Sequence, residues 1–230
     1  MEQEKHYRHE LKYSIAYPDY IAMRSRLRQI MRADPHTSAD GRYRIRSIYF
    51  DNSDDKALRE KINGVAKREK FRIRWYNDDL SFITLEKKVK INSLCQKFDA
   101  LITVDEFRRI LSGDTDFMRE HPSDLVRELY AKMKYQQLRP RVLVSYTREP
   151  YIYDAGHVRI TFDSQIRTSL FTRDFLTKGI SDVSATDTPG DMLVEVKFDA
   201  FLPSVIQDII QTPGIRQQAF SKYGVCRRYG

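Results

Sequence analysis

The chain has 230 residues, 41% of them hydrophobic and 12% aromatic, which is enough to bury a core and excludes an intrinsically disordered protein. Forty Lys and Arg against thirty-two Asp and Glu give a formal net charge of +8, which favours anionic partners such as phosphate, nucleic acid or an acidic membrane. No apolar run approaches the ~20 residues that cross a bilayer, and the two cysteines show neither metal-ligand spacing nor a disulfide framework, so we expect a cytoplasmic protein with one domain over residues 1–230.

Most of the chain alternates apolar and polar residues with the period of two that is typical of β-strands. In chain order, the expected strands are Tyr7–Tyr13, Arg42–Phe50, Lys67–Tyr76, Phe82–Lys90, Leu94–Ile102, Arg141–Tyr151, Val158–Gln165 and Met192–Phe198. Apolar residues at helical spacing predict helices at Pro18–Met31, Val104–Leu111, Asp124–Gln137 and Pro203–Gln211. Because the helices do not alternate regularly with the strands, we expect a mainly β, α+β fold with antiparallel pairing.

Charge is separated between the two faces of these strands. Successive side chains of a strand point to opposite faces, so Lys67–Tyr76 places Phe71, Ile73 and Trp75 on one face. The other face of that strand carries Arg68, Lys70, Arg72 and Arg74. The same alternation groups Arg8, Glu10 and Lys12, then Glu86, Lys88 and Lys90, then Arg159, Thr161 and Asp163, and then Glu195 and Lys197.

Two structures give this alternation. One is an ordinary antiparallel sheet with one face on the core and one in water. The other is a closed eight-stranded barrel whose helices pack on its outer face and whose charged face lines a lumen. Two like charges ~4 Å apart repel by about 4 kcal/mol at an effective dielectric of about 20, so crowded cations in a lumen predict a bound polyanion. Nucleic acid is not expected, because Phe71, Trp75, Phe162 and Phe198 fall on the apolar face, where they cannot stack on bases.

The chemistry of such a lumen points to phosphate. Arg offers paired donors to phosphate oxygens and Lys a compact charge. A divalent ion in a phosphoryl-transfer site is held by one or two carboxylates, and the candidates are Glu195 and Glu10. For each of them the alternative is a carboxylate that only forms an ion pair with a neighbouring Lys or Arg.

Eight motifs occur in an order that carries a family resemblance. They are RHELKY (from Arg8), IRSIYFDN (from Ile45), KFRIRWY (from Lys70), LEKKVK (from Leu85), SYTREPY (from Ser145), VRITFD (from Val158), LVEVKFD (from Leu193) and SKYG (from Ser221). Together they resemble the VTC domain, the catalytic core of the vacuolar transporter chaperone polyphosphate polymerases. That family lies within the triphosphate tunnel metalloenzyme, or CYTH-like, superfamily.

The resemblance implies a tunnel enzyme that transfers the terminal phosphate of ATP to a growing polyphosphate chain with Mn²⁺ or Mg²⁺. Matched motif by motif, it implies metal binding by Glu195 and Glu10 and catalytic roles for Arg72, Arg74, Lys88, Arg159 and Lys197. The phosphate ligands that it implies are Arg8, Lys12, Arg72, Arg74, Lys88, Lys97, Arg148, Arg159, Lys197 and Lys222. The sequence departs from the superfamily at Arg8, which stands at the first glutamate of its ExExK motif, and at Cys95, which shares a strand face with Lys97.

Three functions are consistent with the sequence. The first is metal-dependent polyphosphate synthesis, with ATP and polyphosphate as partners. The second is hydrolysis of triphosphate or polyphosphate, which needs a positioned water in place of the acceptor. The third is a polyphosphate-binding module without catalysis. The eukaryotic relatives act in membrane complexes, so a separate membrane partner is also possible.

Overall fold

The computed structural model describes residues 8–92, 94–169, 182–185, 192–211 and 215–228, and it is dominated by one antiparallel sheet. The strands are β1 (His9–Ile15), β2 (Arg32–Ala33), β3 (Tyr43–Asp51), β4 (Lys67–Tyr76), β5 (Asp79–Ile91), β6 (Leu94–Ile102), β7 (Arg139–Tyr153), β8 (Val158–Ser169), β9 (Val183–Ser184) and β10 (Met192–Phe198). The helices are α1 (Tyr17–Ile30), α2 (Lys56–Ile62), α3 (Val104–Ser112), α4 (Asp124–Tyr135), α5 (Ser204–Ile210) and α6 (Lys222–Cys226). All eight expected strands and all four expected helices are therefore present within a few residues of their predicted bounds.

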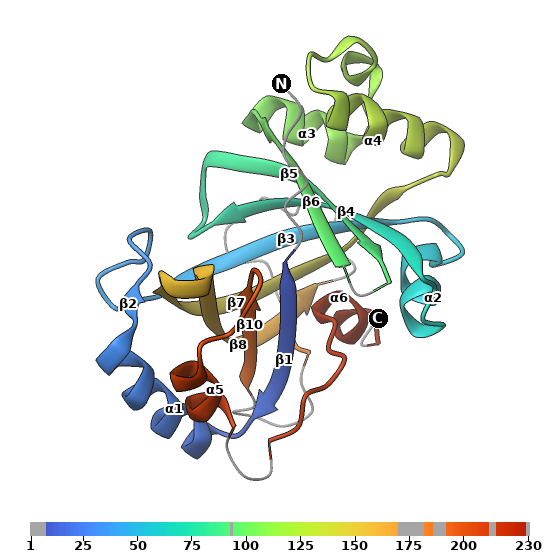
Figure 1. The fold of residues 1–230 in the computed structure, drawn as a ribbon. Helices are drawn as coiled ribbons and strands as arrows, with labels where there is room; N and C mark the ends of the chain where they lie inside the picture. The colour runs from blue at the N-terminus through green and yellow to red at the C-terminus, as the bar shows by residue number, and fades with distance from the viewer. Residues whose placement is uncertain (1–7, 93, 170–181, 186–191, 212–214, 229–230) are drawn as a thin grey trace.

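The sheet has the order β1-β10-β8-β7-β3-β4-β5-β6, with β2 and β9 as short additions to β7 and β8. Every pairing is antiparallel. The sheet curves so that its two edge strands approach each other, as Figure 1 shows. In the described part of the chain they meet at one isolated bridge, between Arg8 and Cys95. The mainly β, α+β fold is confirmed, and the closed barrel is not.

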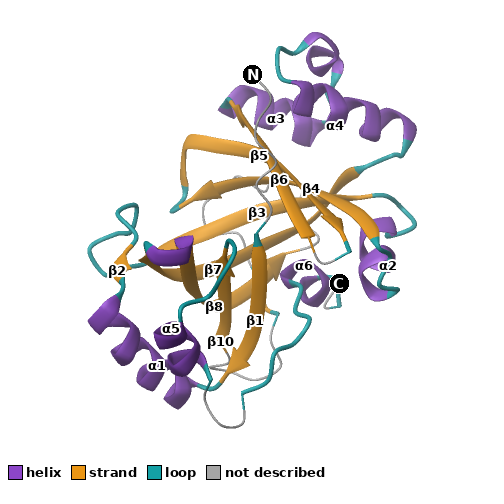
Figure 2. Ribbon diagram, viewed as in Figure 1, coloured by secondary structure: helices purple, strands orange, loops and turns teal. Residues whose placement is uncertain are grey.

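Helices cover the outer, apolar face of this sheet (Figure 2). Phe71, Ile73 and Trp75 of β4 are fully buried against α3 and α4, where Trp75 and Phe107 lie 5.4 Å apart between ring centroids. On the other half of the sheet, α1 and α5 pack against apolar residues of β8 and β10. The apolar sides of the alternating strands therefore form the core, as the pattern predicted.

The C-terminal helix α6 packs on the opposite, inner face of the sheet, which the sequence did not predict. Its Tyr223 and Cys226 are buried against Ile45 and Val144. The Tyr223 hydroxyl donates a hydrogen bond of 2.5 Å to Asp51, whose carboxylate also accepts from backbone N–H groups in the first turn of α2. Asp51 thus connects α2 and α6 on the inner side of the sheet. Within the described residues, no helix is both long enough and apolar enough to span a bilayer.

Candidate functional site

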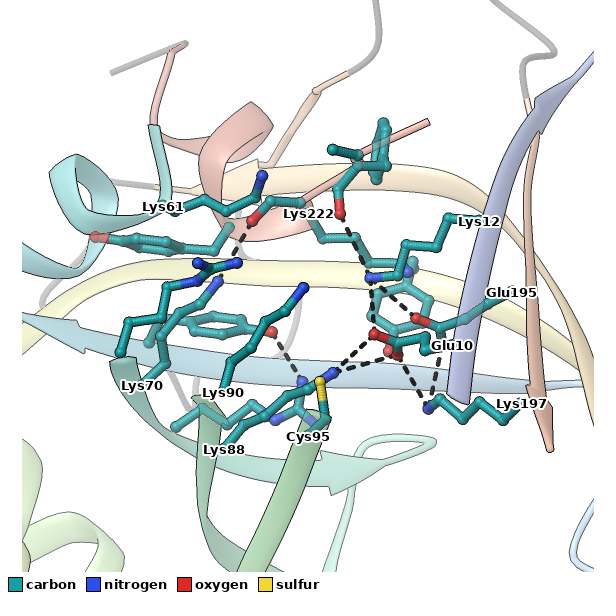
Figure 3. A pocket seen from close by; sticks show the side chains of 18 of the residues that line it. Glu10, Lys12, Lys61, Lys70, Lys88, Lys90, Cys95, Glu195, Lys197 and Lys222 are labelled. Atoms are coloured by element: carbon teal, nitrogen blue, oxygen red, sulfur yellow. Dashed lines mark hydrogen bonds and ion pairs between the residues drawn. The ribbon is translucent and has the colours of Figure 1, made fainter. Parts of the chain in front are cut away.

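The inner face of the sheet encloses a cavity of about 430 Å³ (Figure 3). Its walls come from β1, β3, β4, β5, β6, β7 and β10, from α2, and from α6 with the segment that leads into it. The charged residues that line it are Glu10, Lys12, Lys61, Arg68, Lys70, Arg72, Arg74, Lys88, Lys90, Arg148, Glu195, Lys197 and Lys222. Eleven of these thirteen side chains are cationic, so the cavity suits an anion with several charges.

Two arginines of β4 point into the cavity because they lie on the inner side of the alternation. Arg72 donates to Glu86 from Nε at 2.7 Å and to the Tyr49 hydroxyl at 2.8 Å. Arg74 lies 3.5 Å from the same carboxylate. Burial raises the pKa of Glu86, but the positive charges of Arg72, Arg74 and Lys97 lower it by more than burial raises it. The net pKa is therefore well below its usual range. Glu86 therefore stays ionised and holds the two guanidinium groups in place.

A pair of carboxylates stands at the end of the cavity formed by β1 and β10. The strands pair Lys12 with Glu195 and Glu10 with Lys197, so the two glutamates are diagonal neighbours. Glu195 lies 3.2 Å from Lys12 and 3.4 Å from Lys197, while Glu10 lies 3.0 Å from Lys88. We call Glu10 and Glu195 the carboxylate pair.

Both members of the carboxylate pair remain anionic. Burial raises the pKa of Glu195, yet Lys197, Lys12, Lys222 and Arg148 together hold it well below its usual range. For Glu10, burial and the neighbouring Glu195 raise the pKa, and the surrounding lysines lower it to a net value below normal. Ionised oxygens are what a divalent cation requires.

The donor set fits one mode of metal binding. Among the described residues, no group of three or more His, Cys, Asp and Glu side chains is arranged to hold a metal ion. Mg²⁺ is commonly bound by one or two carboxylates together with substrate phosphates and water rather than by a cage made only of protein groups. Glu10 and Glu195, two ionised oxygen ligands beside a cationic cavity, fit that phosphate-assisted mode.

Arg148 and Lys222 are anchored by a buried aspartate. Arg148 donates to both oxygens of Asp163, at 2.6 and 2.7 Å, and reaches Glu195 at 3.2 Å. The Lys222 ammonium lies 2.6 Å from Asp163, whose side chain is fully buried. Lys222 comes from α6 and Arg148 from β7, so Asp163 fixes the relation of the C-terminal helix to the sheet at the cavity wall.

Four further cations line the cavity on the side of α2, and we call them the mouth cluster: Lys61, Arg68, Lys70 and Lys90. Figure 3 shows Lys61, Lys70 and Lys90 on the opposite side of the cavity from Glu10 and Glu195. The alternation of β4 and β5 indicated an inward direction for three of them, but none stood among the predicted ligands. Lys61 carried no sequence signal, because α2 was not predicted.

The structure brings together nine of the twelve predicted site residues. Arg72, Arg74, Lys12, Lys88, Arg148, Lys197, Lys222, Glu10 and Glu195 all line the cavity. The other three lie outside its lining. Arg8 pairs with Asp199 at 2.9 Å, Lys97 lies 3.2 Å from Glu86, and Arg159 donates to Asp34 at 2.6 Å.

A family model described as the VTC domain matches residues 7–229. A search of curated proteins found no match. Among solved structures, a candidate adenylate cyclase from Bacillus halodurans shares 16% identity with a TM-score of 0.56, covering 95% of this chain and 96% of that one. A protein from Pyrococcus horikoshii shares 13% identity with a TM-score of 0.52, covering 97% and 100%. A candidate adenylate cyclase from Vibrio parahaemolyticus shares 9% identity with a TM-score of 0.51, covering 96% and 98%. At these identities the solved structures show a shared fold.

Proposed function

The chain belongs to the VTC domain family, and from that premise we propose that it is a metal-dependent polyphosphate polymerase. It would transfer the terminal phosphate of ATP to the end of a polyphosphate chain inside a cationic tunnel, acting as one domain. The observation that carries this proposal is the joint lining of one cavity by the carboxylate pair and eleven cations. Such a combination is suited to hold both a phosphate-bound metal ion and a chain of phosphates.

In the proposed reaction, Arg72, Arg74 and Arg148 bind oxygens of the donor triphosphate and the acceptor chain. Lys12, Lys88, Lys197 and Lys222 supply further charge around these oxygens. Glu195 and Glu10 would hold Mn²⁺ or Mg²⁺, which when bound supplies charge neutralisation at the phosphate oxygens. Arg8, Lys97 and Arg159, which lie outside the cavity lining, remain predicted phosphate ligands.

The proposed transfer needs positioning more than it needs a base. An oxygen of the terminal phosphate of the acceptor chain attacks the γ-phosphorus of ATP, and the bond from that phosphorus to the β-phosphate oxygen breaks, releasing ADP. The attacking oxygen is already ionised near neutral pH, since the second pKa of a terminal phosphate is about 6. No proton has to be removed from it. Arginine and lysine side chains that align the phosphates are therefore sufficient protein partners for this step.

Hydrolysis in the same cavity would make a different demand. A water nucleophile must lose a proton, and a carboxylate general base works best when its pKa lies near the working pH. The pKa values of Glu10 and Glu195 are instead lowered by the lysines around them, which makes both carboxylates poor bases. Hydrolysis in this cavity would therefore depend on a bound metal ion to activate the water, whereas transfer to a polyphosphate end needs no such activation.

The test is to incubate the purified protein with ATP and Mn²⁺ or Mg²⁺ and to follow long-chain polyphosphate, ADP and free phosphate together. We expect polymer and ADP to rise in step. Free phosphate without polymer would identify a hydrolase. Tight polyphosphate binding without any turnover would identify a binding module.

A further inference from the structure

The mouth cluster differs from the rest of the cavity because its charges are not neutralised by protein carboxylates. Among the residues that the structure describes, Lys61, Arg68, Lys70 and Lys90 have no Asp or Glu partner. The hydrogen bonds of Arg68 and Lys70 run to neutral groups, the Val65 carbonyl at 2.7 Å and the Ser221 hydroxyl at 3.5 Å. Elsewhere in the cavity, Arg72, Arg148 and Lys88 each contact a carboxylate.

The register between β4 and β5 shows that unpaired positive charge increases along these strands. Arg72 of β4 stands opposite Glu86 of β5, an ion-paired row. Two residues further along, Lys70 stands opposite Lys88, and two further still Arg68 stands opposite Lys90. Each step of two residues advances about 6.7 Å, so the uncompensated row lies about 13 Å from Arg72. Positive charge without a partner therefore increases from the arginine pair of β4 towards α2.

Like charges placed directly opposite each other destabilise a sheet. The effect is visible at Lys70, where burial and then the neighbouring Lys12, Lys88, Arg72 and Arg68 lower the pKa to about 7. Lys61 responds in the same direction, because burial and then Arg68 and Lys90 lower its pKa. An array that repels itself in the free protein is relieved when an anion lies along it.

On strands β7 and β8, by contrast, two cations are paired with protein carboxylates. Arg159 donates hydrogen bonds to Asp34, a buried carboxylate, and to the Tyr43 hydroxyl at 2.9 Å. Arg148 is held by Asp163. These two cations are already neutralised by protein carboxylates. A phosphate chain therefore gains more electrostatic stabilisation by extending towards α2, where the cations have no carboxylate partner among the described residues.

We propose that the mouth cluster is a binding track for the part of a polyphosphate chain that lies beyond the reacting phosphates. The track makes affinity depend on chain length and directs the growing chain out of the cavity beneath α2. The inference rests on the proposed function for the identity of the chain, and it adds residues that set length selectivity and direction. Inorganic polyphosphate fits better than a nucleic acid, because Tyr49 and Tyr223 stack on each other at 5.2 Å instead of presenting their faces to bases.

The test compares two ligands and two sets of variants by equilibrium binding without ATP or metal. The ligands are tripolyphosphate, which has only three phosphoryl groups to place between the reacting site and the track, and a long-chain polyphosphate, which can occupy both. The double variant Lys61→Ala, Lys90→Ala removes two charges from the mouth cluster. The matched control is Arg59→Ala, Lys67→Ala, which removes two exposed charges from α2 and from the outer face of β4.

We expect the mouth variant to lose on the order of a hundredfold in affinity for the long chain, about tenfold for each cation, and about threefold or less for tripolyphosphate. The control should bind both ligands like the unmodified protein. Equal losses for both ligands, or equal behaviour of mouth variant and control, would overturn the inference. So would an RNA of similar length that binds as tightly as polyphosphate and is weakened equally by the mouth variant.

Two further measurements distinguish a loss of binding from a loss of folding or of enzymatic activity. Thermal unfolding of the mouth variant should show no loss of stability, because the change relieves repulsion, and a charge-reversed Lys61→Glu variant should lower long-chain affinity further. The polymerase assay is scored independently on the unmodified protein. An unmodified protein that binds long chains through the track but makes no polymer would contradict the proposed function and leave the inference standing.

Discussion

The Lys12 ammonium lies 3.2 Å from the Glu195 carboxylate across the β1–β10 pair, where the two residues are direct partners in the ladder. Burial and the coulombic attraction of Glu195 act in opposite directions on Lys12, and its net pKa is raised. The two groups thus hold each other in the charged state. This pairing holds one of the two anionic side chains of a cavity whose other charged residues are cationic. Carboxylates that can hold a metal ion distinguish the proposed metal-assisted site from a site that only binds anions.

The substitution Glu195→Gln should therefore separate binding from chemistry. It removes a proposed metal ligand and one negative charge from the cavity, so we expect turnover to fall by at least about a thousandfold. Polyphosphate binding should stay the same or become tighter. Product formation and equilibrium binding measured on one preparation check this, and a parallel loss of both would argue against the metal role of Glu195.

The arginines of β4 should act through both charge and shape. Arg72→Lys with Arg74→Lys keeps two positive charges but loses the paired donors, so we expect about tenfold weaker polyphosphate binding with little change in its salt dependence. Arg72→Ala with Arg74→Ala should weaken binding further and also reduce the salt dependence. Binding titrations at several salt concentrations distinguish the two. Unchanged affinity in both variants would place these arginines outside the binding path.

Binding of polyphosphate should be coupled to uptake of a proton at Lys70. The groups that face it are Lys12 from β1, Lys88 from β5, Arg68 and Arg72 on its own strand, and Tyr223 of α6, whose ring lies 5.6 Å from its ammonium. The free pKa of about 7 should rise when a polyanion binds, because the anion stabilises the ammonium. Affinity should then be constant well below pH 7 and fall as the pH rises above it.

Calorimetry in buffers of different ionisation enthalpy measures this coupling directly. Near pH 8 we expect Lys70 to contribute uptake of close to one proton per site, and near pH 6 almost none. A Lys70→Met variant serves as the control, because it retains the titration of the ligand itself and removes only that of Lys70. Identical proton uptake by the variant and the unmodified protein would contradict this prediction.

Asp163 should contribute strongly to stability through its buried ion pairs. Its fully buried side chain pairs with Arg148 and Lys222. Removing one partner of a buried ion pair costs about 3–5 kcal/mol, so Asp163→Asn should lower the free energy of unfolding by roughly that amount at neutral pH.

The pH dependence of this effect has a definite sign. Burial raises the pKa of Asp163, but Arg148 and Lys222 lower it to a net value below normal. The ionised carboxylate therefore stabilises the fold above its unfolded pKa of about 3.9, and this stability is lost as the pH falls through the lower folded pKa. Urea unfolding should show the gap between variant and unmodified protein shrinking in acid. A gap that is constant from neutral pH to about pH 3 would contradict the ion-pair account.

The alternation of residues was sufficient to predict the strands and the direction of most cavity side chains. On β4, for example, Arg72 and Trp75 lie on the inner and outer faces that a period of two assigns to them. Alternation specifies a face, however, and not a neighbour. Which charges meet depends on register between strands, so the pairing of Arg72 with Glu86 and the uncompensated row of Arg68 and Lys90 could not be read from sequence.

The elements that the sequence did not reveal are those whose formation depends on tertiary contacts. Helix α2 begins after Asp55, which has a positive φ of 51° and makes no side-chain cap. Its first N–H, from Lys56, donates to the Asn52 side chain, and the next two donate to Asp51. Helix α6 has only five residues and is held by burial of Tyr223 on the inner face of the sheet. Lys61 and the position of Lys222 depend on these two helices, so the mouth of the cavity became visible only in the structure.

Polyphosphate synthesis by this protein is tested most directly by phosphorus NMR of a reaction that contains the purified protein, ATP and a divalent metal ion. We expect the resonance of internal polyphosphate groups to grow while ATP is converted to ADP, with one ADP formed for each phosphate added. Glu195→Gln should abolish both changes. Growth of free phosphate alone, or an ATP spectrum that stays constant while the protein binds polyphosphate tightly, would contradict a polymerase.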